Sequence, residues 1–156
     1  MEFIRSLIEI IQRPCWREFY VETSETFLLD RKLEQNKAVV RDFYLLAFNH
    51  RKPEEAMAKY VQTECCQHNP RVGNGVASFI AFVKGYLQAY PNLRYTFKRM
   101  IAEGDLVVLH IHLLREPSDR GMALVDIFRL EDGKIAEHWD VIQEVPEFSA
   151  NHNSMF

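Results

Sequence analysis

Cysteine is scarce in this sequence, and its arrangement argues against two common uses. The chain of 156 residues holds three cysteines, Cys15, Cys65 and Cys66. An odd number with two adjacent members does not suit a disulfide framework, and no CxxC pair is present to hold zinc. We therefore expect a protein of a reducing compartment, with a cytoplasmic location, and no zinc site built from cysteines.

Other features are missing as well, and each absence narrows the function. The chain has no basic tract and a formal net charge of −3, which argues against nucleic acid as a partner. No apolar run reaches the length of a membrane span, and Glu2, Arg5 and Glu9 interrupt a start that lacks the pattern of a signal peptide. No phosphate-binding loop with its lysine and no GxSxG elbow is present. A small molecule or a second copy of the chain is the expected partner.

Residues 1–32 differ from the rest and are interpreted as a helical appendage. Apolar residues recur at helical spacing from Phe3 to Ile11, and Pro14 is expected to end that helix. The segment is expected to pack on the main domain or on a partner subunit. A helix lying on a membrane surface is the alternative, which the mixed charges of its polar face disfavour.

The main domain, residues 33–156, is predicted to place helices first and strands afterwards. Helical spacing covers 33–48, 53–60 and the stretch from a cap at Asn74 to Tyr90. A short extended piece over Cys65–Asn69 precedes the last of these helices. The spacing then changes to alternation, with Asp132-Gly133 as a tight turn. Four strands are expected, over Leu93–Ala102, Leu106–Arg115, Met122–Leu130 and Lys134–Glu144. This order predicts a single α+β domain with an antiparallel sheet.

Several strands are apolar on both faces, which raises the question of what covers the sheet. Leu109, Ile111, Leu113, Val125 and Ile127 are expected to form one surface on the side away from the helices. Such a patch is typical of an interface, so the sequence predicts a homodimer formed by packing sheet on sheet. The alternative is that residues 1–32 fold back over the same face.

Asp126 is the most unusual residue of the sheet. Its neighbours on the same face are Leu124 and Phe128, so its carboxylate must be paired, protonated or turned toward a cavity. His138 and Asp140 share one face of the next strand, at a similar height beyond the turn. Together these groups could tune an acid or base near neutral pH. The plainer interpretation is an ordinary ion pair at a strand end or a sheet edge.

Three further histidines allow more than one interpretation. In His68-Asn69-Pro70 one of the first two side chains should face the pocket, and alternation alone does not say which. His110 and His112 share a strand face and suggest a metal, with His138 or Asp126 as further ligands. Because any alternating strand produces that spacing, we expect no bound transition metal and one of the pair in the polar lining. Cys65 and Cys66 have no obvious paired base and are interpreted as small buried residues.

These segments together resemble a known family. Asp42-Phe43-Tyr44, Lys59-Tyr60, QHNP, a Gly-Asn-Gly cap and VDIFRLEDGKIAEHWDVIQ are similar to SnoaL-like polyketide cyclases, within the ketosteroid isomerase and nuclear transport factor 2-like superfamily. The resemblance covers about residues 34 to 156. It implies a cone-shaped α+β barrel that encloses a pocket, a usual dimer, no cofactor and an intramolecular aldol closure.

The resemblance also implies roles for individual residues. Tyr44 and Asp126 match the oxyanion-binding positions of the isomerases, whose general base falls at Asn69, and asparagine cannot accept that proton. The acid/base role is therefore expected at Asp126, with His138 or His110 as its partner. The catalytic candidates are Asp126, His138 and Tyr44. The candidate ligand-binding residues are His68, Asn69, His110, Asp140 and Tyr60.

Three functions fit these residues. The first is an acid/base enzyme without a cofactor that condenses, cyclises or isomerises a small apolar or aromatic carbonyl compound. The second is a ligand-binding or protein-interaction domain without catalysis, since a fold does not fix a function. The third is a hydrolase in which Asp126 and a histidine activate water against an epoxide or similar electrophile.

Overall fold

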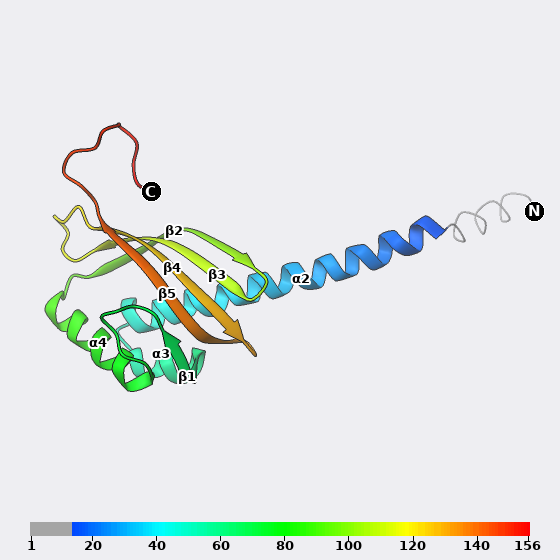
Figure 1. The fold of residues 1–156 in the computed structure, drawn as a ribbon, viewed down its shortest axis with the longest axis horizontal. Coiled ribbons are helices and arrows are strands. Elements are labelled where there is room, and N and C mark those ends of the chain that lie inside the picture. Colours follow the sequence, from blue (N-terminus) through cyan, green and yellow to red (C-terminus); the bar gives the residue numbers. More distant parts are fainter. Residues whose placement is uncertain (1–13) are drawn as a thin grey trace, which may run out of the picture.

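The structure is a computed structural model that describes residues 14–156, with side chains described from residue 25 onward. Figure 1 shows helices on one side of a strongly twisted sheet. The helical elements are α2 (Pro14–Tyr44), the π-helical turn η1 (Leu45–Asn49), α3 (Pro53–Tyr60) and α4 (Val76–Ala89). The strands are β1 (Val61–Gln67), β2 (Arg94–Glu103), β3 (Leu106–Leu114), β4 (Met122–Glu131) and β5 (Lys134–Glu144).

The sheet confirms the predicted α+β fold. Its strand order is β1-β5-β4-β3-β2, with β1 parallel to β5 and the remaining pairs antiparallel. The hairpin between β4 and β5 turns at Asp132 and Gly133, whose φ angles of 52° and 74° suit a tight two-residue turn. The sheet stays open, with β1 and β2 as its edges, so it curves around the core without closing into a full barrel.

The core lies between the helices and the inner face of the sheet. Val40 of α2, Ala56 of α3 and Val83 of α4 are fully buried, and so are Leu109 and Ile111 of β3. The helices therefore close the inner face completely at these points. Within the described residues, no helix has both the length and the apolar character needed to cross a membrane.

Helix α2 is longer than the sequence indicated. The helix expected over Phe3–Ile11 and its expected end before Pro14 lie outside the described residues, which begin in α2. Helix α2 runs without a break to Tyr44, so the expected boundary between residues 32 and 33 falls inside it. Figure 1 shows its N-terminal half projecting beyond the sheet.

A single wide turn joins α2 to the next segment. In η1 the N–H of His50 donates to the carbonyl of Leu45, a spacing of five residues rather than four, at 2.8 Å. This turn buries Ala47 and Phe48 directly after Tyr44. Turns of this kind inside helices are frequent at functional sites, and here one follows a candidate site residue.

The five side chains expected on one outer surface are divided between the two faces of the sheet. Leu109 pairs with Asp126 and therefore points inward, whereas His110 pairs with Val125 and points outward. Leu109, Ile111 and Leu113 belong to the core, and Val125 is partly exposed outside. The predicted patch is thus wrong, because the sequence did not fix the register between β3 and β4. Dimerisation itself stays a prediction.

Candidate functional site

A cavity of about 260 Å³ lies between the helices and the inner face of the sheet. Most of its wall is apolar, and the aromatic residues in it come from α2, η1, α4, β2 and β4; these are Phe43, Tyr44, Phe48, Phe79, Phe82, Tyr86, Tyr95 and Phe128. The polar part of the wall comes from β1, β4, β5 and the loop after β1, and consists of Gln67, Asn69, Arg71, Asp126, His138 and Asp140. An apolar chamber with a few converging polar groups is typical of a small-molecule site.

Asp126 lies at the centre of the polar wall. Only 2% of its surface is exposed. Its Oδ1 atom accepts a hydrogen bond from the Tyr44 hydroxyl at 2.9 Å and lies 3.0 Å from Nε2 of His138. Its Oδ2 atom is buried and has no hydrogen-bond partner in the described part of the chain. A ligand hydroxyl or a water that reached this oxygen would remove an unfavourable state, because an unpaired buried carboxylate oxygen is costly.

Tyr44 is held in its protonated form. Burial raises the pKa of its phenol well above the ordinary value, and the nearby Asp126 carboxylate adds to the rise. The phenol has one hydrogen, and the contact with Asp126 uses it. Tyr44 therefore orients the carboxylate in this structure, and it has no second hydrogen with which to bind an oxyanion of a ligand.

Gln67 determines which nitrogen of His138 carries a proton. Its Oε1 atom accepts the backbone N–H of Asn69 at 2.9 Å, so the oxygen and not the amide nitrogen faces this site. The same oxygen lies 2.9 Å from Nδ1 of His138, and since an amide oxygen only accepts, Nδ1 must donate. The hydrogen on Nδ1 thus follows from the bonding network around Gln67.

One further proton must then lie between His138 and Asp126. If the imidazole is neutral, Nε2 carries a lone pair, which would face an unprotonated carboxylate oxygen at 3.0 Å and be repelled. Two arrangements avoid this repulsion: an imidazolium beside a carboxylate, or a neutral imidazole that accepts from a carboxylic acid. Both hold a single shared proton at the wall of an aromatic cavity. The pair is a local reservoir for one proton.

Asp140 is a second carboxylate on the same wall. It is the direct partner of Asp126 across the β4–β5 ladder and is only half-buried. The side-chain N–H of Asn69 donates to its Oδ2 atom. The Asn69 oxygen accepts the backbone N–H of Arg71 at 2.8 Å, which fixes the amide so that its nitrogen faces Asp140. Asn69 therefore holds a carboxylate in place at a position where an aspartate would repel it.

The structure separates the candidate residues into two groups. Tyr44, Asp126, His138, Asn69 and Asp140 all face the cavity. The other three candidates do not line it. His68 is turned to the outside of β1, where its ring stacks on Trp139 at 4.7 Å. Of His68 and Asn69, then, Asn69 is the residue that faces the pocket.

His110 and Tyr60 require correction as ligand-binding candidates. His110 is on the outer face of β3, beside Arg99 and close to the ring of Phe156. Its position follows from the register, which sets it opposite the outward-facing Val125. Tyr60 ends α3 as a half-buried ring with the Lys59 ammonium 4.9 Å from its centre. Neither contributes to the cavity wall.

Gln67 is the site residue that sequence reasoning missed. Gln67 belongs to the QHNP segment, but its uncharged amide gave no reason to assign it a role in the site. The signal that could have found it is alternation along β1: Cys65, Gln67 and Asn69 line the cavity, whereas Cys66 and His68 point away. The helix cap predicted at Asn74 is also wrong, because Gly75 is the cap and the Asn74 side chain accepts the backbone N–H of Gln67 at 3.0 Å.

A comparison with protein families shows which family the chain is related to. The profile of the SnoaL-like polyketide cyclases matches residues 38–150. The chain belongs to this family. The match covers α2 from its last two turns onward, the whole sheet and every residue of the cavity wall. No protein among the curated sequences matches the chain.

Solved structures show the same SnoaL-like fold. TsrD from Streptomyces laurentii is 25% identical, with a TM-score of 0.58 over 70% of this chain and 88% of its own. A Kribbella flavida protein, provisionally described as a ketosteroid isomerase, is 23% identical, with a TM-score of 0.60 over 80% and 89%. A Bacillus cereus protein, provisionally described as a polyketide cyclase, is 19% identical, with a TM-score of 0.60 over 69% and 74%.

The polar wall also has the composition of a metal site. Asp126, His138 and Asp140 each offer one ligand atom, and these atoms lie within 4.8 Å of one another. A cation bound there would have to displace the proton shared by Asp126 and His138, since both atoms of that contact would become ligands. The hydrogen bonds of Asp126 with Tyr44 and of His138 with Gln67 are explained by a proton shared between Asp126 and His138 as well as by a bound cation.

Proposed function

We propose that this chain is an acid/base enzyme without a cofactor, which cyclises or isomerises a small apolar or aromatic carbonyl compound. The observation that carries the proposal is the 3.0 Å contact between Nε2 of His138 and Oδ1 of Asp126 at the wall of an aromatic cavity. The family supports cyclase or isomerase chemistry at a general level. The Bacillus and Kribbella proteins are provisionally described with the same two activities.

The chemistry needs one group that removes a proton beside a carbonyl and one that returns a proton to oxygen or carbon. Asp126 and His138 can do both in turn, because the pair can take up a proton from carbon and give one up to oxygen. In an intramolecular aldol closure, the carbon that loses its proton attacks a second carbonyl, and the new alkoxide receives a proton. The product has the atoms of the substrate, so no co-reactant is required.

Tyr44 takes a different role from the one the family resemblance implied. Its hydroxyl orients Asp126, so the developing oxyanion would be stabilised by the shared proton itself or by the Asn69 amide. Asp140 lies next to both and is more exposed than Asp126, which makes it the group that a bound carbonyl compound would meet first. The aromatic wall excludes water and binds the apolar part of the substrate.

The test compares two carboxylates of the same wall. Asp126→Asn and Asp140→Asn are assayed with the wild type on a panel of apolar diketones and enones, by following deuterium incorporation beside the carbonyl and the formation of product. Asp126→Asn should lower turnover by roughly 10²–10⁴-fold, as expected for loss of general acid/base catalysis. An active wild type that is unaffected by Asp126→Asn would contradict the assignment.

Two outcomes would support the other functions. A ligand that co-purifies in the cavity and is returned unchanged, without deuterium exchange, would identify a binding protein. Incorporation of oxygen from labelled water into a ring-opened epoxide would identify a hydrolase. The aldol and isomerase reactions place no water oxygen in the product, so the label separates them from hydrolysis.

A further inference from the structure

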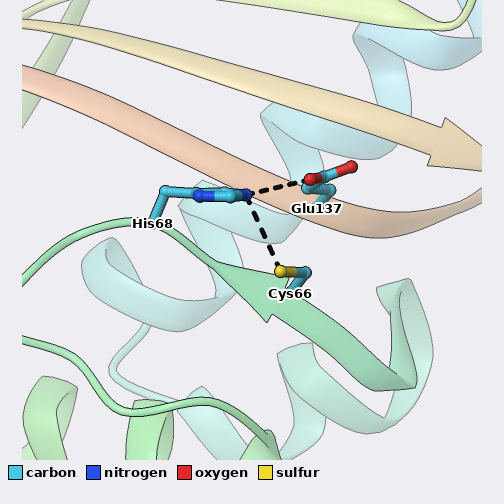
Figure 2. A group of neighbouring side chains, drawn as sticks. All are labelled: Cys66, His68 and Glu137. Atoms are coloured by element: carbon cyan, nitrogen blue, oxygen red, sulfur yellow. Dashed lines mark hydrogen bonds and ion pairs between the residues drawn. The ribbon is translucent and has the colours of Figure 1, made fainter.

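A second group of reactive side chains lies on the opposite side of the β1–β5 junction from the cavity. Cys66 is paired with Glu137 across the parallel ladder, and His68 follows two residues later on the same side of the chain. Figure 2 shows the three side chains converging between the two strands. None of them lines the cavity. No base for either cysteine is apparent from the sequence, but the fold brings His68 to Cys66.

The geometry of this group differs from that of a catalytic relay. Nε2 of His68 lies 2.9 Å from Oε1 of Glu137 and 3.7 Å from Sγ of Cys66. A cysteine–histidine–carboxylate relay uses one ring nitrogen for the sulfur and the other for the carboxylate. Here one nitrogen makes both contacts, so no proton can pass along the chain from sulfur to carboxylate.

Convergence of three donor atoms on one side is what a metal ion requires. The sulfur, nitrogen and oxygen atoms all lie within 4.8 Å of one another. A tetrahedral Zn²⁺ at ordinary bond lengths separates a sulfur from a nitrogen ligand by about 3.6 Å, and a nitrogen from an oxygen ligand by about 3.4 Å. The observed separation of 3.7 Å matches the first value, and that of 2.9 Å is about half an ångström shorter than the second, so a cation would move the imidazole and the carboxylate slightly apart.

The surrounding residues already hold two of the donors in position. The His68 ring lies 4.7 Å from the Trp139 ring at an angle of 7°, and its backbone N–H donates to the carbonyl of His138 at 3.0 Å. Arg129 donates to Oε2 of Glu137 at 2.9 Å, which leaves Oε1 free to face the other donors. Such outer contacts orient metal ligands.

The charge of Arg129 opposes a cation at this place, but it does not act alone. Glu131 also contacts Arg129, at 3.2 Å, so two carboxylates outweigh one guanidinium. The group is also partly exposed, with 41% of the His68 side chain and 21% of the Glu137 side chain accessible. A cation would therefore be bound from solution with moderate affinity and without opening the fold.

Contrary to the expectation from the sequence that cysteines form no zinc site and that no transition metal is bound, we propose that Cys66, His68 and Glu137 bind one divalent cation of the zinc and cobalt class. A thiolate and an imidazole favour such ions over magnesium or calcium, whose ligands are oxygens. Binding releases the thiol proton to solvent, and the ring donates the Nε2 lone pair with its hydrogen on Nδ1. Three protein ligands leave a fourth position for water. The cation joins the edge strand β1 to β5, and this proposal stands apart from the chemistry of the cavity.

The test titrates Co²⁺ alone into the full chain after metal has been removed with a chelator and the thiols have been reduced. Coordination by a thiolate gives cobalt a charge-transfer absorption, and Zn²⁺ should then displace it. The absorption should saturate at one ion per chain and disappear in Cys66→Ser. His68→Gln and Glu137→Gln should weaken binding by roughly tenfold or more. Cys65→Ser is the matched control, since it changes the adjacent thiol on the cavity side and should bind as the wild type does.

Several results would overturn the proposal. The first is the absence of a saturable thiolate absorption in the wild type. The second is an absorption that persists in Cys66→Ser, which would place the thiolate elsewhere in the chain. The third is an equal loss in Cys65→Ser, and the fourth is saturation at one ion per two chains, which would show a bridge between molecules. Circular dichroism of each variant establishes that a lost signal does not come from unfolding.

Discussion

Two histidines lie back to back at the β1–β5 junction and face opposite sides of the sheet. His138 is 9% exposed, and both of its ring nitrogens are used, one by Gln67 and one by Asp126. His68 is exposed, stacks on Trp139 and uses one nitrogen for two neighbours. Each has a carboxylate at about hydrogen-bond distance. Burial makes the inner contact a store for one proton, whereas exposure leaves the outer contact open to ions from solution.

The largest expected effect is on the free energy of unfolding, and it distinguishes a substitution on the inner face of the sheet from one on the outer face of the neighbouring strand. Leu109→Ala removes a fully buried side chain and should lower the free energy of unfolding by about 2–5 kcal/mol. Val125→Ala, on the outer face and 37% exposed, should cost less than about 1 kcal/mol. Urea denaturation of both variants measures the difference. Equal costs would mean that the outer face is covered as completely as the core.

The next comparison concerns the two histidine networks, measured in the presence of a chelator. Gln67→Met removes the acceptor for Nδ1 of His138 and should cost about 1–3 kcal/mol of unfolding free energy. His68→Gln breaks only a partly exposed contact and should cost less than about 1 kcal/mol. A Gln67→Met variant with unchanged stability would contradict the role given to Gln67.

Alkaline pH should destabilise the inner face in particular. Burial raises the pKa of Tyr44 and of Tyr95 well above the ordinary value, so the unfolded chain loses these protons first as pH rises. The contribution of these two phenols to the free energy of unfolding should therefore be complete below about pH 10. Above that pH it should fall by up to about 1.4 kcal/mol per pH unit for each tyrosine. Tyr44→Phe should make this decline shallower. Urea denaturation at a series of alkaline pH values measures the slope, and equal slopes would contradict the prediction.

The smallest effect concerns the adjacent cysteines, which face opposite sides of β1. Burial raises the pKa of Cys65 to about 11, whereas Cys66 is exposed. A thiol reagent should therefore modify Cys66 faster than Cys65, by roughly tenfold or more, because the thiolate is the reacting form. Peptide mass spectrometry after short exposure to the reagent gives both rates. Faster modification of Cys65 would show that the cavity is more open than its aromatic wall indicates.

The strands were predictable from the sequence because their signals are local. Alternation between two tight turns determined β3, β4 and β5 to within one or two residues at each end. The same alternation, continued from Asp126 to His138 and Asp140, indicated that these side chains could share a wall. What alternation within a strand does not contain is the register between strands, which decided the places of His110 and Val125.

Other features depended on contacts that the sequence does not display. The helix of the main domain was expected to begin at residue 33, yet α2 already covers Pro14 and the residues that follow it. Gln67 has no charge to indicate a role, and its importance comes from two hydrogen bonds to one oxygen. The contact between Cys66 and Glu137 depends on the parallel pairing of β1 with β5, which joins residues about 70 positions apart.

The projecting helix α2 affects how the molecule moves through solution. Its 31 residues span about 46 Å, whereas a compact domain of roughly 120 residues is about 35 Å across. Such a rod increases frictional drag without adding much mass. A single chain should therefore sediment more slowly and leave a gel-filtration column earlier than a sphere of 18.4 kDa. An apparent mass well above 18.4 kDa is expected even from a monomer, so the predicted dimer is to be judged by light scattering, which measures mass independently of shape.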